Sequence, residues 1–336
     1  MITRRAFLGR ATALGATALV GVGSPSAATE PPPETARVRL AWPGGTCQAP
    51  KYIAEELLHA EGFTDVQYGL KGTSVPDSAR LKALGAGDTD FDLTFAPNLI
   101  AGQEAGQSFV ILAGGHIGCY ELFGTERIRT IRDLRGKTIG ARERPGSEYF
   151  FVAMMLSYIG LDPNKDVRWL LHPRPEAARL LSEGKIDAFL GLPPRTQELR
   201  AKKIGHVVVN STTDRPWRDY FCCMVAGNRD FVRRHPAATK RVVRALMKAN
   251  DVCALDPERA ARLVVGRGET TNYEYALQTM KEIPYRAWRD YDPADTVRFY
   301  ALRLHEAGLI KSSPQKILAD GTDWRFLNEL KKELKG

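Results

Sequence analysis

The chain has 336 residues, with 48 Lys and Arg residues against 39 Asp and Glu residues, which gives a formal net charge of +9. Hydrophobic residues make up 43% of the chain and charged residues 26%, a composition that is ordinary for a globular protein. The positive excess is spread along the sequence, which argues against a nucleic-acid partner.

The N-terminus predicts an export signal. The stretch Thr3-Arg4-Arg5-Ala6-Phe7 resembles the twin-arginine consensus. A mildly apolar stretch from Ala11 to Val22 follows, and Ser26-Ala27-Ala28 is typical of a cleavage site. This stretch is shorter than the roughly 20 residues that cross a bilayer, so we expect no stable membrane insertion after cleavage. We therefore predict a twin-arginine signal peptide over residues 1–28 and a periplasmic mature protein of 308 residues.

The next part of the chain predicts a βαβαβ unit. Residues 29–35 contain three prolines and are expected to form a linker. Alternating or apolar runs predict strands over 38–42, 66–70 and 91–95, and amphipathic stretches predict helices over 50–60 and 76–86. This alternation predicts a parallel sheet with helices on both faces.

An internal echo predicts a second, related unit. Leu84-x-x-Gly87-x-x-Asp90-x-x-Leu93-x-x-x-Pro97 recurs 97 residues later as Leu181-x-x-Gly184-x-x-Asp187-x-x-Leu190-x-x-x-Pro194. In each copy a helix ends at Gly, Asp begins a short strand, and Pro closes the loop beyond that strand. Five matched positions at one offset favour two α/β lobes of common design.

The remaining elements follow the same logic. A turn over 131–137 leads into a strand, Gly146 opens an apolar helix that runs to Ile159, and 167–171 predicts the next strand. Further strands are expected over 207–210 and 221–225. From Arg229 onward the chain is predicted to be mostly helical, and helix starts are marked by Pro236, Pro257, Pro293 and Pro314.

The five cysteines are expected to act as small buried hydrophobic residues. They are Cys47, Cys119, Cys222, Cys223 and Cys253, and no two of them form a C-x-x-C motif. A bond between the adjacent Cys222 and Cys223 would be strained. We expect no metal site and no cofactor from this arrangement.

Several of these features resemble the periplasmic solute-binding proteins of nitrate, sulfonate, taurine and thiamine-precursor importers. The resemblance is carried by the two Gly-x-x-Asp units, by Asp133-Leu134-Arg135-Gly136-Lys137 before a strand, by Gly146-Ser147 at a helix start, and by Asn228-Arg229-Asp230-Phe231. It implies an α/β fold, a two-lobe clamp in which each lobe is a mostly parallel sheet flanked by helices, with extra C-terminal helices. Lobe 1 would comprise residues 36–118 and 226–336, and lobe 2 residues 119–225, with crossings near 118–120 and 221–225.

Candidate ligand-binding residues lie at the ends of the predicted strands, where open parallel sheets bind ligands. Trp42 ends the first strand and offers an aromatic wall, although a core position is equally compatible with its sequence. Thr73 and Ser74 offer hydroxyl groups in the loop after the second strand, and Asn98 follows the first Pro-containing loop. Each also has an ordinary alternative role, as a solvated loop residue or a helix cap.

The second lobe supplies the remaining candidates. The resemblance carries over by position to Gly146 and Ser147, and a helix N-terminus suits an anionic group. Glu148 would oppose a simple anion if it faced the cleft, and would favour a ligand with N–H groups or positive charge. Tyr149 is a candidate for stacking on a planar ligand, and Arg195 for pairing with an anionic group. Tyr120 lies on a crossing, where it either touches ligand or packs in the core.

The function predicted from these features is the substrate-binding component of an ABC-type importer, which captures a small polar or planar organic solute by hinge closure. Its expected partners are a small-molecule ligand and the membrane permease subunits, and a monomer is expected. No catalytic residue is predicted. Two alternatives stay open: an enzyme similar to thiamine-pyrimidine synthases that uses Cys222-Cys223, for which no histidine partner is evident, and a ligand-binding sensor partner without transport.

Overall fold

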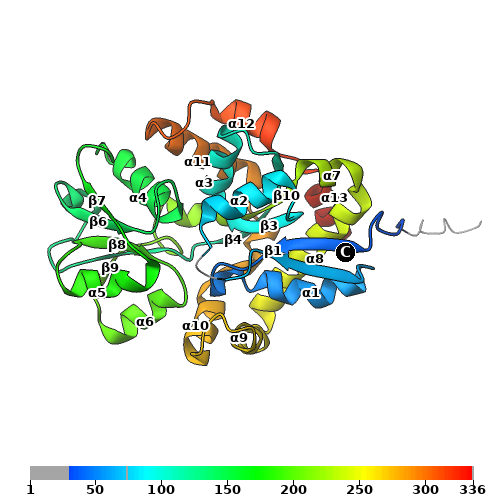
Figure 1. Ribbon diagram of the computed structural model, residues 1–336, viewed down its shortest axis with the longest axis horizontal. Helices are drawn as coiled ribbons and strands as arrows, with labels where there is room; N and C mark the ends of the chain where they lie inside the picture. Colours follow the sequence, from blue (N-terminus) through cyan, green and yellow to red (C-terminus); the bar gives the residue numbers. More distant parts are fainter. Residues whose placement is uncertain (1–29, 73–74, 335–336) are drawn as a thin grey trace, which may run out of the picture. The chain divides into compact units, whose positions relative to one another are not determined.

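The computed structural model describes residues 30–72 and 75–334, so the predicted signal peptide lies outside the described residues. Two five-stranded sheets organise this part of the chain (Figure 1). The first sheet comprises β1 (Arg37–Ala41), β2 (Asp65–Gly69), β3 (Phe91–Phe95), β4 (Phe109–Ile117) and β10 (Phe221–Asn228). The second comprises β5 (Glu121–Gly124), β6 (Thr138–Ala141), β7 (Arg168–Leu171), β8 (Ala188–Gly191) and β9 (His206–Asn210).

The two sheets share one topology. Their strand orders are β2-β1-β3-β10-β4 and β7-β6-β8-β5-β9. In each sheet the first three strands are parallel, and the fourth strand runs antiparallel to both of its neighbours. Four of the five strands in each sheet therefore run in the same direction. This confirms the predicted fold class, a pair of mostly parallel sheets flanked by helices.

The sequence echo corresponds to equivalent contacts in the two sheets. Asp90 precedes β3, and its Oδ2 accepts a hydrogen bond from the Arg39 backbone N–H at 2.7 Å. Asp187 precedes β8, and its Oδ2 accepts from the Thr138 N–H at 2.8 Å. In both copies the aspartate's own N–H also donates to the carbonyl of that same residue on the neighbouring strand. The repeated aspartate thus ties the start of one parallel strand to the next.

Helices flank both sheets. They are α1 (Pro50–Ala60), α2 (Asp77–Ala86), α3 (Ala96–Glu104), α4 (Ser147–Tyr158), α5 (Ala177–Ser182), α6 (Arg195–Lys202), α7 (Arg229–Arg234), α8 (Pro236–Leu255), α9 (Pro257–Gly266), α10 (Tyr273–Glu282), α11 (Pro293–Glu306), α12 (Pro314–Gly321) and α13 (Arg325–Glu333). The four C-terminal prolines each occupy the first helical position, as predicted, where a missing N–H costs no hydrogen bond. No helix among the described residues has the length and apolar character needed to cross a membrane.

We call the first sheet with helices α1–α3 and α7–α13 the first lobe, and the second sheet with α4–α6 the second lobe. The chain passes from β4 to β5 through residues 118–120. It returns between β9 and β10, because the whole of β10 pairs with β3 and β4. Residues 221–225 therefore belong to the first sheet, and the second crossing lies before the position that the sequence predicts. The complete domain boundaries stay a prediction.

A buried ion pair fixes the loop that leaves β1. The Nζ of Lys51 lies 2.7 Å from Asp92 Oδ1, and both side chains are 1% exposed. The same Nζ donates to the Trp42 carbonyl at 3.4 Å, and Arg80 Nη1 donates to that carbonyl at 2.5 Å. Two cations therefore hold the end of β1 and the Gly44-Gly45 turn that follows it.

Replacing Lys51 with Met is expected to destabilise the protein by about 3–5 kcal/mol, because it leaves the buried Asp92 carboxylate without its cation. Urea unfolding measures this change. The matched control is Lys332→Met, since Lys332 is exposed, and it should change the unfolding free energy by about 0.5 kcal/mol or less. Equal stability of the two variants would contradict the assigned role of Lys51.

Candidate functional site

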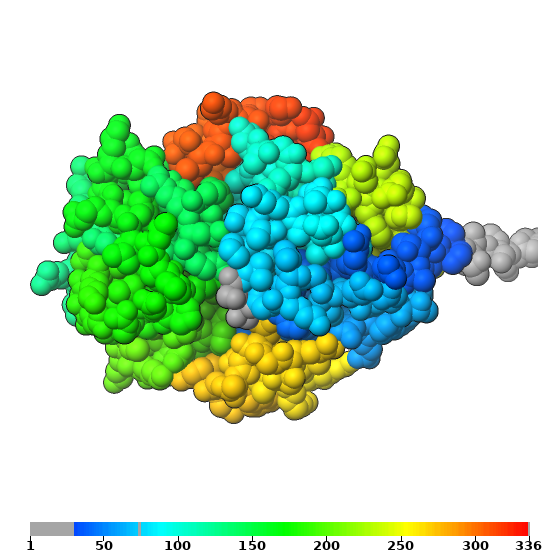
Figure 2. Space-filling model, in the orientation of Figure 1, coloured from blue at the N-terminus to red at the C-terminus, as the bar shows by residue number. Residues whose placement is uncertain are grey.

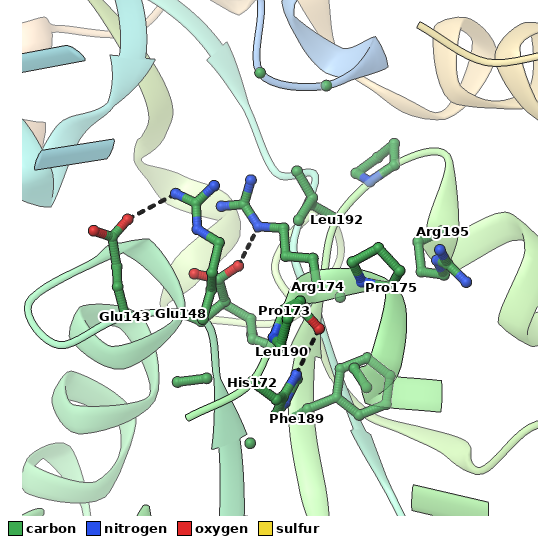
Figure 3. Close-up of a pocket in the computed structure, with 18 of the residues that line it drawn as sticks. Glu143, Glu148, His172, Pro173, Arg174, Pro175, Phe189, Leu190, Leu192 and Arg195 are labelled. Atoms are coloured by element: carbon green, nitrogen blue, oxygen red, sulfur yellow. Dashed lines mark hydrogen bonds and ion pairs between the residues drawn. The ribbon is translucent and has the colours of Figure 1, made fainter. Parts of the chain in front are cut away.

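A cavity of about 650 Å³ lies between the two lobes (Figure 3). The first lobe contributes Gly44, Gly45, Pro76 and Glu269. The second lobe contributes residues 140–143, Glu148, 171–175, Ala177 and 189–195. Cavities of this size are typical of sites for small organic ligands.

The position of the cavity follows from the direction of the strands. Residues 140–143, 171–175 and 189–195 lie at or just beyond the carboxyl ends of β6, β7 and β8, which run parallel. The Gly44-Gly45 turn lies just beyond the carboxyl end of β1 in the other sheet. Backbone turns and side chains from both sheets therefore meet where parallel sheets bind ligands. Leucine, proline and phenylalanine residues in these loops give the cavity largely apolar walls.

Two arginine–glutamate ion pairs lie in the part of the cavity wall that the second lobe forms. Arg174 Nε donates to Glu148 Oε1 at 2.5 Å, and Arg142 Nη2 donates to Glu143 Oε1 at 2.7 Å. Figure 3 shows Arg174 and Glu148 turned toward each other, with Arg195 farther along the wall beyond Pro175. Both arginines are mostly buried, with side-chain exposures of 22% for Arg174 and 10% for Arg142. Such charge-assisted pairs are short and directional, so they fix the side chains that surround the cavity.

Asp77 of the first lobe joins this charged group, although it does not itself line the cavity. Its carboxylate lies 3.0 Å from Arg142 Nη2 and 3.7 Å from Arg174 Nη2. It also accepts hydrogen bonds from Ser147, at 2.5 Å from Oγ and 3.3 Å from the backbone N–H. Burial raises the pKa of Asp77, but Arg174 and Arg142 outweigh this effect and lower that pKa to about 2. A first-lobe carboxylate is therefore held ionised against the second lobe.

This contact changes the interpretation of the α4 N-terminus. The sequence predicts that Gly146 and Ser147 receive an anionic ligand group there. In the structure Gly146 is the N-cap residue, and the Asp77 carboxylate already occupies the hydrogen-bonding position at Ser147. The protein's own anion thus satisfies the helix N-terminus. The N-terminus of α4 therefore does not need a second, external anion.

Glu269 supplies an acceptor from the first lobe. Its Oε1 accepts hydrogen bonds from Trp42 Nε1 at 3.0 Å and from the Tyr52 hydroxyl at 2.5 Å. Its Oε2 is buried and has no hydrogen-bond partner in the described part of the chain. Burial raises the pKa of Glu269 above its ordinary value, and the hydrogen bonds from Tyr52 and Trp42 offset only part of this increase. Trp42 itself is not among the cavity-lining residues, so it acts on the cavity by positioning Glu269.

Glu148 supplies a second acceptor from the opposite lobe. It lies in the first turn of α4, is 3% exposed, and lines the cavity. Arg174 binds its Oε1, whereas its Oε2 is buried without a partner among residues 30–72 and 75–334. Buried carboxylate oxygens are costly unless they accept hydrogen bonds. Glu148 and Glu269 therefore favour a ligand that donates N–H groups from an apolar body.

The other predicted residues fall in different places. Arg195 lines the cavity and is paired with Glu198 at 3.4 Å. Asn98 is buried, does not line the cavity, and donates to Ser147 Oγ at 2.7 Å, so it supports the α4 N-terminus. Tyr120 packs against the rings of Phe95 and Phe151, and Tyr149 packs edge-on against Trp169. Neither tyrosine lines the cavity, and Thr73 and Ser74 lie outside the described residues.

Sequence reasoning missed the residues that carry most of the charge. They are Asp77, Arg142, Glu143, Arg174 and Glu269. Arg142 follows β6 and Arg174 follows β7 within a few residues. Because parallel sheets bind ligands at the carboxyl ends of their strands, the sequence could have indicated both arginines. Asp77 and Glu269 carried no such signal, because their roles depend on contacts with residues far away in the sequence.

Comparison with known proteins supports the resemblance predicted from the sequence. The NMT1-like family model matches residues 124–265. The bicarbonate-binding protein CmpA of Synechococcus elongatus is 28% identical over 120 residues, which are 35% of this chain and 26% of that protein. The nitrate import ATP-binding protein NrtC of Synechocystis is 23% identical over 149 residues, 42% of this chain and 22% of that protein. The matched parts span about a quarter of the length of these curated relatives.

Solved structures extend the similarity to most of the fold. The periplasmic nitrate-binding protein NrtA from Synechocystis has a TM-score of 0.74 at 16% identity, and the match covers 90% of each chain. The alkanesulfonate-binding protein SsuA from Xanthomonas axonopodis, bound to MOPS, has a TM-score of 0.67 at 16% identity, with 83% of this chain and 96% of that chain covered. These matches confirm the periplasmic-binding-protein fold.

Replacing Asp77 with Asn is expected to create an anion site, because it removes the carboxylate that neutralises Arg142, Arg174 and the α4 N-terminus. Sulfate should then stabilise the variant by about 0.3–2 kcal/mol more than it stabilises the wild type. Unfolding in sodium sulfate and in sodium chloride at equal ionic strength measures the difference. Asp295→Asn is the matched control, since Asp295 lies in the first turn of α11 and is exposed. The same sulfate response in all three proteins would refute the role of Asp77.

Proposed function

We propose that this protein is the periplasmic substrate-binding component of an ABC-type importer. The observation that carries the proposal is the cavity between two sheets of identical topology, with one unpartnered buried carboxylate oxygen supplied by each lobe. A ligand that donates to both Glu148 and Glu269 would bind the two lobes to each other. This geometry supports ligand capture by hinge closure as part of the proposal.

The ligand we propose is a small organic solute with an apolar, planar or compact body and N–H donor groups. The cavity of about 650 Å³ exceeds what an inorganic anion of a few atoms needs. The three arginines that line it are matched by three glutamates, and Asp77 already binds Arg142, Arg174 and the helix N-terminus that would otherwise attract simple anions. Nitrate, bicarbonate and plain sulfonates are therefore poor candidates for this chain, although similar proteins bind them.

Cross-lobe contacts on two sides of the cavity support a hinge. Asp77 meets Arg142 and Arg174 on one side. On another side Arg200 of α6 contacts Glu282 of α10 at 2.7 Å, and Figure 2 shows these green and orange segments in contact. We place the hinge in residues 118–120 and in the segment between β9 and β10. Both groups of ion pairs would break and reform as the lobes separate.

We further propose that the protein binds its ligand without converting it. Cys222 and Cys223 are buried and are not among the cavity-lining residues, so they are not placed to attack a ligand there. The proposal has three further parts. The protein is exported by a twin-arginine signal over residues 1–28, the mature protein is a monomer, and its partners are a permease and the ATPase of that permease. Similarity to a nitrate import ATP-binding protein supports the last of these.

A thermal-shift and calorimetric screen of the purified chain should find a saturable ligand among N–H-bearing organic solutes, such as pyrimidines, amines and amino acids. At 100 times its dissociation constant, such a ligand adds roughly 2.7 kcal/mol of stability. Glu148→Gln should weaken binding about tenfold or more, since it removes a charge-assisted acceptor. Arg168→Asn, an exposed substitution on β7, should leave affinity unchanged. Recovery of the ligand in altered form, or tight binding of nitrate alone, would refute the proposal.

Glu282→Gln is expected to raise the ligand's dissociation constant about three- to tenfold, although Glu282 does not line the cavity. The substitution weakens the Arg200 contact that favours the closed form, and a smaller closed population lowers apparent affinity. Isothermal titration measures this effect. Glu306→Gln, which affects an exposed carboxylate paired with Arg303 within α11, serves as the control. Unchanged affinity in Glu282→Gln would show that this contact does not contribute to closure.

A further inference from the structure

Five buried residues with metal-binding side chains gather around His116 in the first lobe and the first crossing. One ligand atom from each of Cys47, His116 and Cys119 lies within 4.8 Å of the other two. Cys222 joins them, with its Sγ 3.3 Å from the Cys119 Sγ. Cys223 pairs with His116 in the register of β10 and β4. All five side chains are at most 6% exposed. We call these five residues the thiol cluster.

The thiol cluster corrects part of the sequence analysis. The cysteines are buried, as expected, and all five are free thiols. No histidine partner for Cys222-Cys223 is evident in the sequence, but β4 and β10 are antiparallel neighbours and bring His116 opposite Cys223. Four of the five cysteines gather in one place, whereas only Cys253 stands apart in α8. Small hydrophobic residues would serve equally well if packing were the only requirement.

His116 provides an independent indication of a ligand. Its side chain is fully buried, and its Nδ1 lies 3.3 Å from the Ile117 carbonyl oxygen. Its Nε2 is buried and makes no hydrogen bond within the described segments. A buried imidazole nitrogen without a partner is uncommon, and metal ligation is a frequent explanation for one. A backbone carbonyl beside Nδ1 is also the usual second contact of a metal-binding histidine.

Cys119 adds a conformational indication. Its φ angle is 96°, in the left-handed region that residues with a side chain rarely adopt. Thr212 Oγ1 accepts from its backbone N–H at 3.2 Å and helps to hold this conformation. Unusual backbone conformations persist where the surroundings enforce them, frequently at functional positions. Here the conformation accompanies a sulfur placed beside Cys47, His116 and Cys222.

The electrostatics of the thiol cluster suit a cation. The four sulfur atoms and the imidazole are buried, so a thiolate among them would lack the water that otherwise stabilises its charge. Buried thiolates are stabilised by positive charge, and a bound metal supplies it while displacing the thiol protons.

We propose that Cys47, His116 and Cys119 bind one soft metal ion, zinc(II) or copper(I), with Cys222 or Cys223 as a further ligand. Three thiolates and one imidazole form a common tetrahedral zinc set, and thiolates also select copper(I). Hard cations such as calcium and magnesium prefer oxygen ligands, and the thiol cluster contains no carboxylate.

The site joins the parts that form the cavity. Cys47 lies two residues after Gly45, and a β carbon placed on Gly45 would lie 4.0 Å from the Cys47 Sγ. Cys119 belongs to the first crossing between the lobes, and Cys222 lies in β10 of the first sheet. A bound ion therefore fixes the glycine turn of the cavity wall to the first crossing and to the start of β10. Its role is to stabilise the hinge region. This role rests on the proposed binding function and adds a structural metal ion to it.

Metal uptake by the reduced, chelator-treated full chain tests the proposal. We expect about one equivalent of cobalt(II) with the visible bands of a tetrahedral thiolate site, displaced by one equivalent of zinc(II). A parallel arm measures copper(I) by competition with bicinchoninate, and the tighter ion identifies the preferred metal. Native mass spectrometry of the wild type gives the stoichiometry without any variant. Failure to bind zinc(II) or copper(I) would overturn the proposal.

Paired variants locate the site. Cys119→Ser and Cys47→Ala should each weaken metal affinity about 100-fold or more, whereas Cys253→Ser should bind as the wild type does. Cys253 is an equally buried cysteine outside the thiol cluster, so it controls for the loss of a core thiol. Unchanged affinity in both cluster variants would overturn the assignment. A Cys119–Cys222 disulfide in the natively exported protein, with no metal bound, would do so as well.

Discussion

The organisation of the candidate site depends on the ionised carboxylate of Asp77. It extends from the first lobe, caps α4 of the second lobe through Ser147, and lies between Arg142 and Arg174. These arginines in turn hold Glu143 and Glu148. Because the group is mostly buried, each charge is retained only while its partners stay in place. One first-lobe residue thus determines both the geometry of the second-lobe wall and the charge that a ligand encounters.

The fold was largely predictable because its signals are local. Asp90 and Asp187 recur at one sequence offset and make equivalent backbone contacts, and prolines such as Pro236 and Pro293 mark helix starts. The site was predictable only in part. Glu148 and Arg195 line the cavity, as their positions near strand and helix ends suggested. Ser147 was expected to bind a ligand, but it binds Asp77, which is 70 residues away and belongs to the other lobe.

The thiol cluster and the cavity share one structural element, the turn and short helix from Gly44 to Gln48. Gly45 faces the cavity, and Cys47 faces the thiol cluster. A ligand and a metal that both order this element reduce each other's entropic cost, and any such coupling is reciprocal. This arrangement could not be predicted from the sequence, because the cysteines are isolated or adjacent along the chain and do not have the spacing of a metal-binding motif. The antiparallel pairing of β4 and β10 brings Cys223 opposite His116, and Cys47 and Cys119 approach His116 from other segments.

Hydrogen exchange with and without the compound that gives the largest thermal shift tests the central claim most directly. The claim is that one ligand contacts both lobes and closes them. It predicts slower amide exchange in two separate groups of peptides, 44–49 and 265–272 in the first lobe and 142–150 and 171–177 in the second. Residues 118–120 should change as well, since they form one crossing. Protection confined to one lobe would contradict the claim, because the ligand would then bind without joining Glu148 to Glu269.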